Sequence, residues 1–104
     1  MKNYVFAFYG GPNFASPEEG AKHMAKWKDW MRGLGGALVN PGTPFGKTKT
    51  ISADGVSAAS GSKRLTGYSI VRAESMDAAL EMAKRCPHLD HGTVDVAEVM
   101  EMQM

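Results

Sequence analysis

The segment over residues 2–9 (KNYVFAFY) constrains the fold most, because it is apolar on both of its faces. Successive residues of a β-strand point to opposite sides of the sheet. Tyr4, Phe6 and Phe8 therefore point to one side of the sheet. Val5, Ala7 and Tyr9 point to the other side. A strand with one face in water alternates apolar with polar residues. We therefore expect helices of the same chain to cover one face and a second copy to cover the other, which predicts a homodimer.

Length and composition limit the class of protein. The 104 residues form one expected domain, 1–104, with a hydrophobic content of 43% and a charged content of 22%, both ordinary for a globular protein. The net charge of +1 provides no general attraction to nucleic acid, and no apolar run approaches the ~20 residues of a membrane span. One cysteine excludes an internal disulfide, and no signal-peptide pattern opens the chain. We expect a cytoplasmic protein that binds neither nucleic acid nor membrane.

Helix and strand signals alternate along the chain. Ser16, Pro17 and Glu19 predict a helix start that Gly35 ends near residue 34, because they match a capping box, a first-turn proline and a C-terminal glycine. A second helix follows Ser75 and stops before Cys86-Pro87. Strands are expected at 2–9, 37–39, 66–73 and 93–99, with a hairpin at 48–52 turning at 53–55.

This order is β-α-β, a small hairpin insertion, then β-α-β. It is the ferredoxin-like pattern, an α+β fold in which both helices pack on one face of an antiparallel sheet. The segment over residues 60–62 is expected to be a linker after the hairpin.

Four segments carry a family resemblance: Gly67 to Ile70 (GYSI), 75–80 (SMDAAL), 83–87 (AKRCP) and 92–96 (GTVDV). Together they resemble the YCII-related family and are most similar to its DGPF-type branch. The resemblance extends over nearly the whole chain. It implies a ferredoxin-like fold assembled as a dimeric α/β barrel, with a cleft near the dimer interface. Some members of this family carry a His-Asp pair in that cleft.

The chain departs from that branch at two places. The Asp-Gly-Pro-Phe segment is absent before Gly67, where residues 60–65 read SGSKRL. Of the His-Asp pair, only the histidine carries over, as His23 in the first helix. Relatives that end the second helix with Asp-Pro have an acid where this chain has Cys86-Pro87.

His23 is the expected catalytic residue. It lies at the edge of the apolar stripe of the first helix, on the side of Trp27 and Trp30. A partly buried imidazole that titrates near neutral pH suits a general acid or base. The alternative is a boundary histidine that bonds to a backbone carbonyl. Asp29 is turned away from it, and Asp54 reaches it only if the hairpin folds over the cleft.

Two classes of function follow from these residues. One is a small cleft enzyme that acts on a small organic molecule by acid–base chemistry through His23. Its expected ligand contacts are Trp30, Tyr68 and Asp54, whereas Trp27 is expected in the core. The other class is a non-catalytic module that binds a small ligand or a partner protein between its sheets.

The run CPHLDH over residues 86–91 contains metal-ligating residue types but has no second cluster at zinc-site spacing. We expect no metal, with Cys86 packed as a small hydrophobic residue and His88 capping the last helix carbonyls. The helix C-terminus raises a thiol's pKa, which excludes Cys86 as a nucleophile. Residues 10–13 (GGPN) lack both phosphate-loop spacings, and no cofactor is expected.

Overall fold

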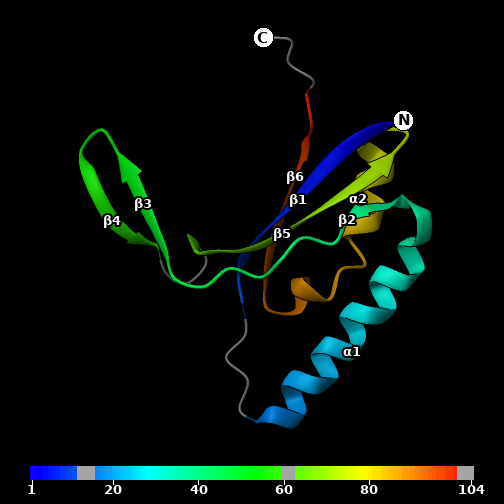
Figure 1. Cartoon of the computed structure of the whole chain (residues 1–104), viewed down its shortest axis with the longest axis horizontal. Helices are drawn as coiled ribbons and strands as arrows, with labels where there is room; N and C mark the ends of the chain where they lie inside the picture. The colour runs from blue at the N-terminus through cyan, green and yellow to red at the C-terminus, as the bar shows by residue number, and fades with distance from the viewer. Residues whose placement is uncertain (12–15, 60–62, 101–104) are drawn as a thin grey trace.

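The computed structural model describes residues 1–11, 16–59 and 63–100. A four-stranded antiparallel sheet has the order β2-β5-β1-β6, which is the ferredoxin-like arrangement predicted from the sequence. Two helices follow β1 and β5 (Figure 1). The strands are β1 (Lys2–Gly10), β2 (Leu38–Asn40), β3 (Thr48–Ser52), β4 (Gly55–Ala59), β5 (Leu65–Ala73) and β6 (Gly92–Glu98).

Both helices begin at the predicted caps. Helix α1 (Pro17–Leu34) starts after Ser16, whose Oγ accepts the N–H of Glu19 at 3.3 Å, and ends where Gly35 takes a φ of 54°. Helix α2 (Met76–Ala83) starts after Ser75, whose Oγ accepts the N–H of Ala78 at 3.1 Å. It stops at Ala83, before Cys86, and the 3-10 turn η3 (Pro87–Asp90) leads into β6.

The two faces of β1 differ in burial. Tyr4, Phe6 and Phe8 are buried on the face that packs with the helices, whereas Val5, Ala7 and Tyr9 on the other face are half-buried. The buried core extends across both helices and the neighbouring strand, and consists of Tyr4, Phe6, Phe8, Trp30, Val71, Ala73, Ala79, Ala83 and Cys86. Burial was expected on both faces of β1, and the structure shows it complete on the face that the helices cover.

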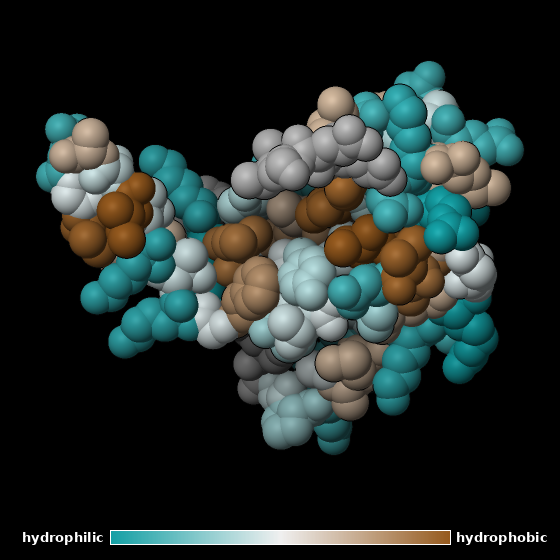
Figure 2. Space-filling view, turned by 45° about the horizontal axis from the view of Figure 1, so that its top comes forward, coloured by the Kyte–Doolittle hydropathy of each residue, from teal (hydrophilic) through white to brown (hydrophobic). Residues whose placement is uncertain are grey.

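The β3–β4 hairpin forms its own two-stranded sheet and projects from the body of the molecule (Figure 1). Ile51 and Val56 face each other in its register, and their side chains are 78% and 64% exposed. Figure 2 shows this apolar surface at the end of the hairpin, away from the rest of the molecule. The linker predicted at residues 60–62 and the proline of the first turn, Pro12, lie outside the described residues.

After β2 the chain runs along the edge of β5 and is fixed there. Ser69 Oγ donates to the carbonyl of Pro41 at 2.9 Å, and the N–H of Phe45 donates to Thr66 O at 2.8 Å. Gly42 has a φ of +73°, and a Cβ at this position would collide with the carbonyl of Tyr68. Glycine is therefore required for the close approach of the two backbones, which builds one wall of the site described next.

Among the described residues, no helix is long and apolar enough to cross a membrane.

Candidate functional site

A cavity of about 400 Å³ opens between the middle of α1 and one end of the sheet. Its size is within the range of small-molecule sites. Its walls come from α1, the end of β1, the segment after β2, the first half of β5 and η3; helix α2 contributes none of them. The side chains that carry chemistry or aromatic surface in this lining are Phe8, His23, Trp27, Arg64, Ser69 and His88.

His23 is bonded to Trp27 one helical turn later. The indole Nε1 of Trp27 donates to His23 Nε2 at 2.7 Å, as the i, i+4 spacing on one helix face allows. An indole N–H is only a donor, so His23 Nε2 accepts and carries no proton. In the neutral imidazole the proton is then on Nδ1. The Trp27 bond therefore selects one tautomer of His23.

The surroundings of His23 also favour its neutral form. Partial burial lowers the pKa of His23 below its ordinary value of 6.5, and repulsion from His91 lowers it further. The two rings are 5.3 Å apart between centroids. Asp90 acts in the opposite direction, but its carboxylate also pairs with Lys26 Nζ at 3.5 Å. At neutral pH His23 is consequently an uncharged imidazole in an apolar wall.

His88 is the second histidine in the lining, and it is 5% exposed. Its Nε2 lies 2.7 Å from the backbone carbonyl oxygen of Tyr9. A carbonyl only accepts, so His88 Nε2 carries the proton and donates it. Its ring packs against Phe8 at 5.3 Å and Trp27 at 6.5 Å between centroids. His88 therefore bonds to β1, and not to the last carbonyls of α2 as predicted.

The other residues of the run 86–91 contact different parts of the molecule. Cys86 is buried in the core, and burial raises the pKa of its thiol to about 11, so it is protonated and unsuited to nucleophilic attack. The predicted rise is confirmed, although its main cause is burial. Asp90 pairs with Lys26 and His91 approaches His23. In the part of the chain that the structure describes, no three His, Cys, Asp or Glu residues are grouped to hold a metal.

Arg64 and Tyr68 both border the strand side of the cavity. Tyr68 pairs with Ala7 in the register of β1 and β5, so its side chain lies on the sheet face opposite the helices. Arg64 is exposed, and its Nη2 donates to the carbonyl of Phe45 at 3.4 Å. The ring of Tyr68 stacks on Phe45 with 5.7 Å between centroids. Arg64 therefore adds a cation beside the cavity, whereas the Tyr68 ring packs on Phe45, outside the lining.

The structure places the four predicted site residues in different environments. His23 lines the cavity, whereas Tyr68 borders it with its ring on the opposite face of the sheet. Trp30 does not: it is 8% exposed, and its Nε1 donates to the carbonyl of Met82 at 3.0 Å in the core. Asp54 lies in the exposed turn of the hairpin, outside the lining. The roles predicted for the two tryptophans are reversed, because Trp27 borders the cavity and Trp30 fills the core.

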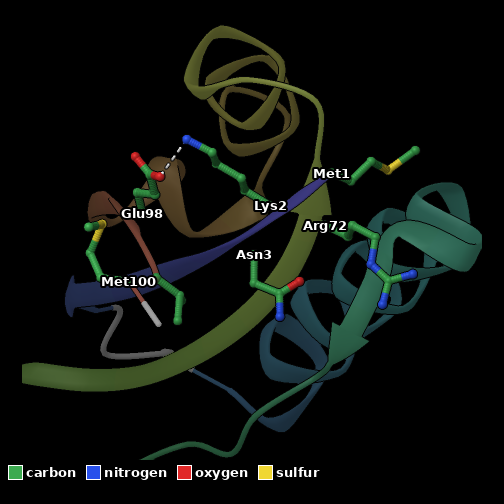
Figure 3. A pocket seen from close by; sticks show the side chains of 7 residues that line it. Met1, Lys2, Asn3, Arg72, Glu98 and Met100 are labelled. Atoms are coloured by element: carbon green, nitrogen blue, oxygen red, sulfur yellow. Dashed lines mark ion pairs between the residues drawn. The ribbon is translucent and has the colours of Figure 1, made fainter. Parts of the chain in front are cut away.

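A wider hollow of about 770 Å³ lies at the opposite end of the sheet, lined by residues 1–3, Arg72 and residues 98–100 (Figure 3). Lys2 and Glu98 form an ion pair at 2.9 Å across it. This contact raises the pKa of Lys2, mainly through the hydrogen bond from its ammonium group to the carboxylate. Both side chains are solvent-accessible, and the lining holds neither a histidine nor an aromatic residue. The histidine-lined cavity is therefore the better functional site.

Comparison with known proteins identifies a family and solved structures of similar fold. The model of the family described as YCII-related domain matches residues 2–103. The fold is similar to that of 5-chloro-2-hydroxyhydroquinone dehydrochlorinase (TftG) from Burkholderia phenoliruptrix AC1100, solved in complex with 2,5-dihydroxybenzoquinone. The TM-score is 0.61 at 14% identity, over 96% of this chain and 95% of the other. No curated protein matches the sequence.

Proposed function

Because this chain belongs to the YCII-related family, we propose that its cavity binds a small organic molecule and that His23 stabilises negative charge that develops on it. The observation that carries the proposal is the bond from Trp27 to His23 within the cavity lining. It holds a neutral imidazole of defined tautomer at a largely apolar cavity, and a histidine with a perturbed pKa at a cavity is a candidate functional group.

The chemistry that suits this arrangement is hydrogen-bond donation to a developing oxyanion. The neutral His23 carries its proton on Nδ1, since Nε2 accepts from Trp27. A preorganised donor in a water-poor cavity stabilises negative charge on a carbonyl or enol oxygen. Arg64, at the same cavity, adds positive charge. The substrate class is accordingly a small ring with carbonyl and hydroxyl oxygens.

The structural neighbour supports this class of ligand. It was solved with 2,5-dihydroxybenzoquinone, a six-membered ring that carries both kinds of oxygen. A ring of that size fits within about 400 Å³. Phe8 and Trp27 offer apolar surface to the ring.

A titration of the ¹⁵N-labelled chain with 2,5-dihydroxybenzoquinone tests the proposal. We expect the Trp27 indole N–H resonance to shift, and His23→Gln to weaken binding by roughly three- to tenfold, as for one lost hydrogen bond. Asp54→Asn is the matched control, because Asp54 lies outside the cavity. Chloride release from a chlorinated hydroxyhydroquinone then tests turnover. No shift at millimolar ligand refutes the binding site.

The second candidate is a non-catalytic binding module. It is favoured by the same bond, since His23 Nε2 cannot take a proton from a substrate while it accepts from Trp27. Binding of the quinone without turnover, with equal loss in His23→Gln, supports this candidate over the enzyme.

We also propose a homodimer formed through the sheet face opposite the helices. The half-buried Val5 and Ala7 lie there beside Ile70 and Tyr68 in the register of β1 and β5. A standard interface would bury about 800 Å² on each subunit. Light scattering should give a dimer mass, reduced to the monomer by Val5→Lys but unchanged by Glu74→Lys at the exposed end of β5. A monomeric wild type contradicts this assembly.

A further inference from the structure

We infer that His88 is a second ligand-binding residue of the cavity, and that its Nδ1 accepts a hydrogen bond from a hydroxyl group of the bound molecule. This inference deepens the proposed function, on which it rests, because it concerns the same cavity. The two neutral histidines then have opposite hydrogen-bonding roles: His23 donates to the ligand and His88 accepts from it.

The first step is the tautomer of His88. Its Nε2 lies 2.7 Å from Tyr9 O, so Nε2 must carry the proton. The neutral ring then has its lone pair on Nδ1. Gly92 maintains this bond, because a Cβ at that position would collide with Tyr9 O and lie 2.6 Å from His88 Nε2.

The second step is the accessibility of Nδ1. Within residues 1–11, 16–59 and 63–100, the bond to Tyr9 is the only hydrogen bond that the side chain of His88 makes. Across the same residues, no fully buried side-chain nitrogen or oxygen lacks a partner. Since Nδ1 has no partner, it is not fully buried. Since His88 lines the cavity, Nδ1 must be accessible from there for the ligand contact to form.

The third step is the rigidity of the ring. Phe8 and Trp27 pack against His88 at 5.3 and 6.5 Å between centroids, and the Tyr9 bond fixes the remaining rotation. A fixed acceptor loses little conformational freedom when a ligand binds. The arrangement resembles an orienting carbonyl behind a histidine that acts through its other nitrogen.

The fourth step is the relation to His23. Both rings contact Trp27, at 6.2 Å for His23 and 6.5 Å for His88. His23 and His88 therefore both contact the Trp27 indole at the wall of the cavity.

This pair selects a chemical class of ligand. The ligand carries a hydroxyl that donates to His88 Nδ1 and an oxygen that accepts from His23, on a flat apolar framework beside Phe8 and Trp27. Phenols and enols meet this description. If the hydroxyl proton moves to His88, Tyr9 O stabilises the resulting imidazolium by accepting its Nε2–H. The electron pair of the broken O–H bond stays on the ligand oxygen, which accepts a hydrogen bond from His23.

The test uses the ¹⁵N-labelled full chain with 2-naphthol and its methyl ether, 2-methoxynaphthalene. Two-bond ¹H–¹⁵N correlation reports which ring nitrogen of each histidine is protonated. We expect His88 protonated on Nε2 and His23 on Nδ1. The naphthol should shift the Nδ1 resonance of His88 and bind roughly three- to tenfold more tightly than the ether, as for one hydrogen bond.

Two variants separate the histidines. His88→Phe should abolish the preference for naphthol over its ether, whereas His23→Gln should weaken both ligands alike, since both carry an acceptor oxygen. The wild-type spectra decide the question even if His88→Phe fails to fold.

The outcomes distinguish the two proposals. Equal binding of naphthol and ether with an unchanged His88 Nδ1, or a His88 protonated on Nδ1, overturns the role of His88 and leaves the cavity as a binding site. Binding of neither compound at millimolar concentration overturns the role of His88 together with the proposed function.

Discussion

The helix-covered layer has a sealed half and a hollow half, although α1 and β1 run through both. In the sealed half, Phe6 packs on Trp30 with 6.1 Å between centroids, and α2 adds Ala79 and Ala83 to the core. In the hollow half, Phe8 meets Trp27 edge-on at 5.1 Å, and the remaining space is the cavity. The same two elements thus build a core at one end and a binding site at the other.

The difference arises from where the covering elements end and from small residues opposite β1. Strand β2 ends at Asn40, and α2 contributes nothing to the cavity lining. Phe6 and Phe8 face Ser69 and Gly67 across the sheet. The backbone after β2 approaches at Gly42, where no side chain fits. The cavity therefore exists because the covering elements are short and because small residues line it. No additional segment is needed to form such a site.

The largest expected effect separates the two phenylalanines. Phe6→Ala should lower the free energy of unfolding by about 3–5 kcal/mol, because it leaves a void in a fully packed region. Phe8→Ala should cost less, since one side of Phe8 already faces the cavity. Denaturant unfolding of both variants measures the difference. An equal or larger loss for Phe8→Ala would break the distinction between the halves.

The next effect concerns the bond between His88 and Tyr9. Gly92→Ala should cost about 1–3 kcal/mol, because the new methyl group forces both partners apart. Gly36→Ala is the matched control, since a Cβ there meets nothing within 4 Å. Thermal or chemical unfolding compares the two. A tolerated Gly92→Ala would show that the backbone of the hollow half moves freely.

A smaller effect distinguishes the two indole hydrogen bonds. Trp27→Phe removes the donor to His23 and should cost about 0.5–1.5 kcal/mol. It should also raise the pKa of His23, because that bond favours the neutral imidazole. Trp30→Phe removes the donor to Met82 in the sealed half and should leave the pKa of His23 unchanged. NMR titration of both variants decides the point.

The smallest effect is a pH dependence of stability. The pKa of His23 is lowered in the folded protein, mainly by burial, so the folded state binds fewer protons than the unfolded state just below pH 6.5. The contribution of His23 to the free energy of unfolding is therefore fully present above pH 6.5. It is lost as the pH falls through the lower pKa that His23 has in the folded protein. Unfolding between pH 5 and 8 should show a steeper acid slope for wild type than for His23→Gln; equal slopes contradict this.

Much of the fold was predictable because its signals are local. The capping residues Ser16, Ser75 and Gly35 each act within a few positions of the helix end they define. The two-sided pattern of residues 2–9 correctly indicated a central strand, since β1 pairs on both edges with β5 and β6. The family resemblance is confirmed, whereas the dimer and the DGPF-type branch stay predictions.

The sequence by itself determined the elements, their order and the helix face of His23, since helical periodicity places it on the side of Trp27. Only the tertiary structure decided that Trp27 borders the cavity, that Trp30 is sealed, and that Asp54 lies far from both. It also decided the direction of His88, whose bond to Tyr9 joins residues 79 positions apart. Periodicity shows which face of an element is buried, but a cavity forms where covering elements end, and that depends on contacts between distant parts of the chain.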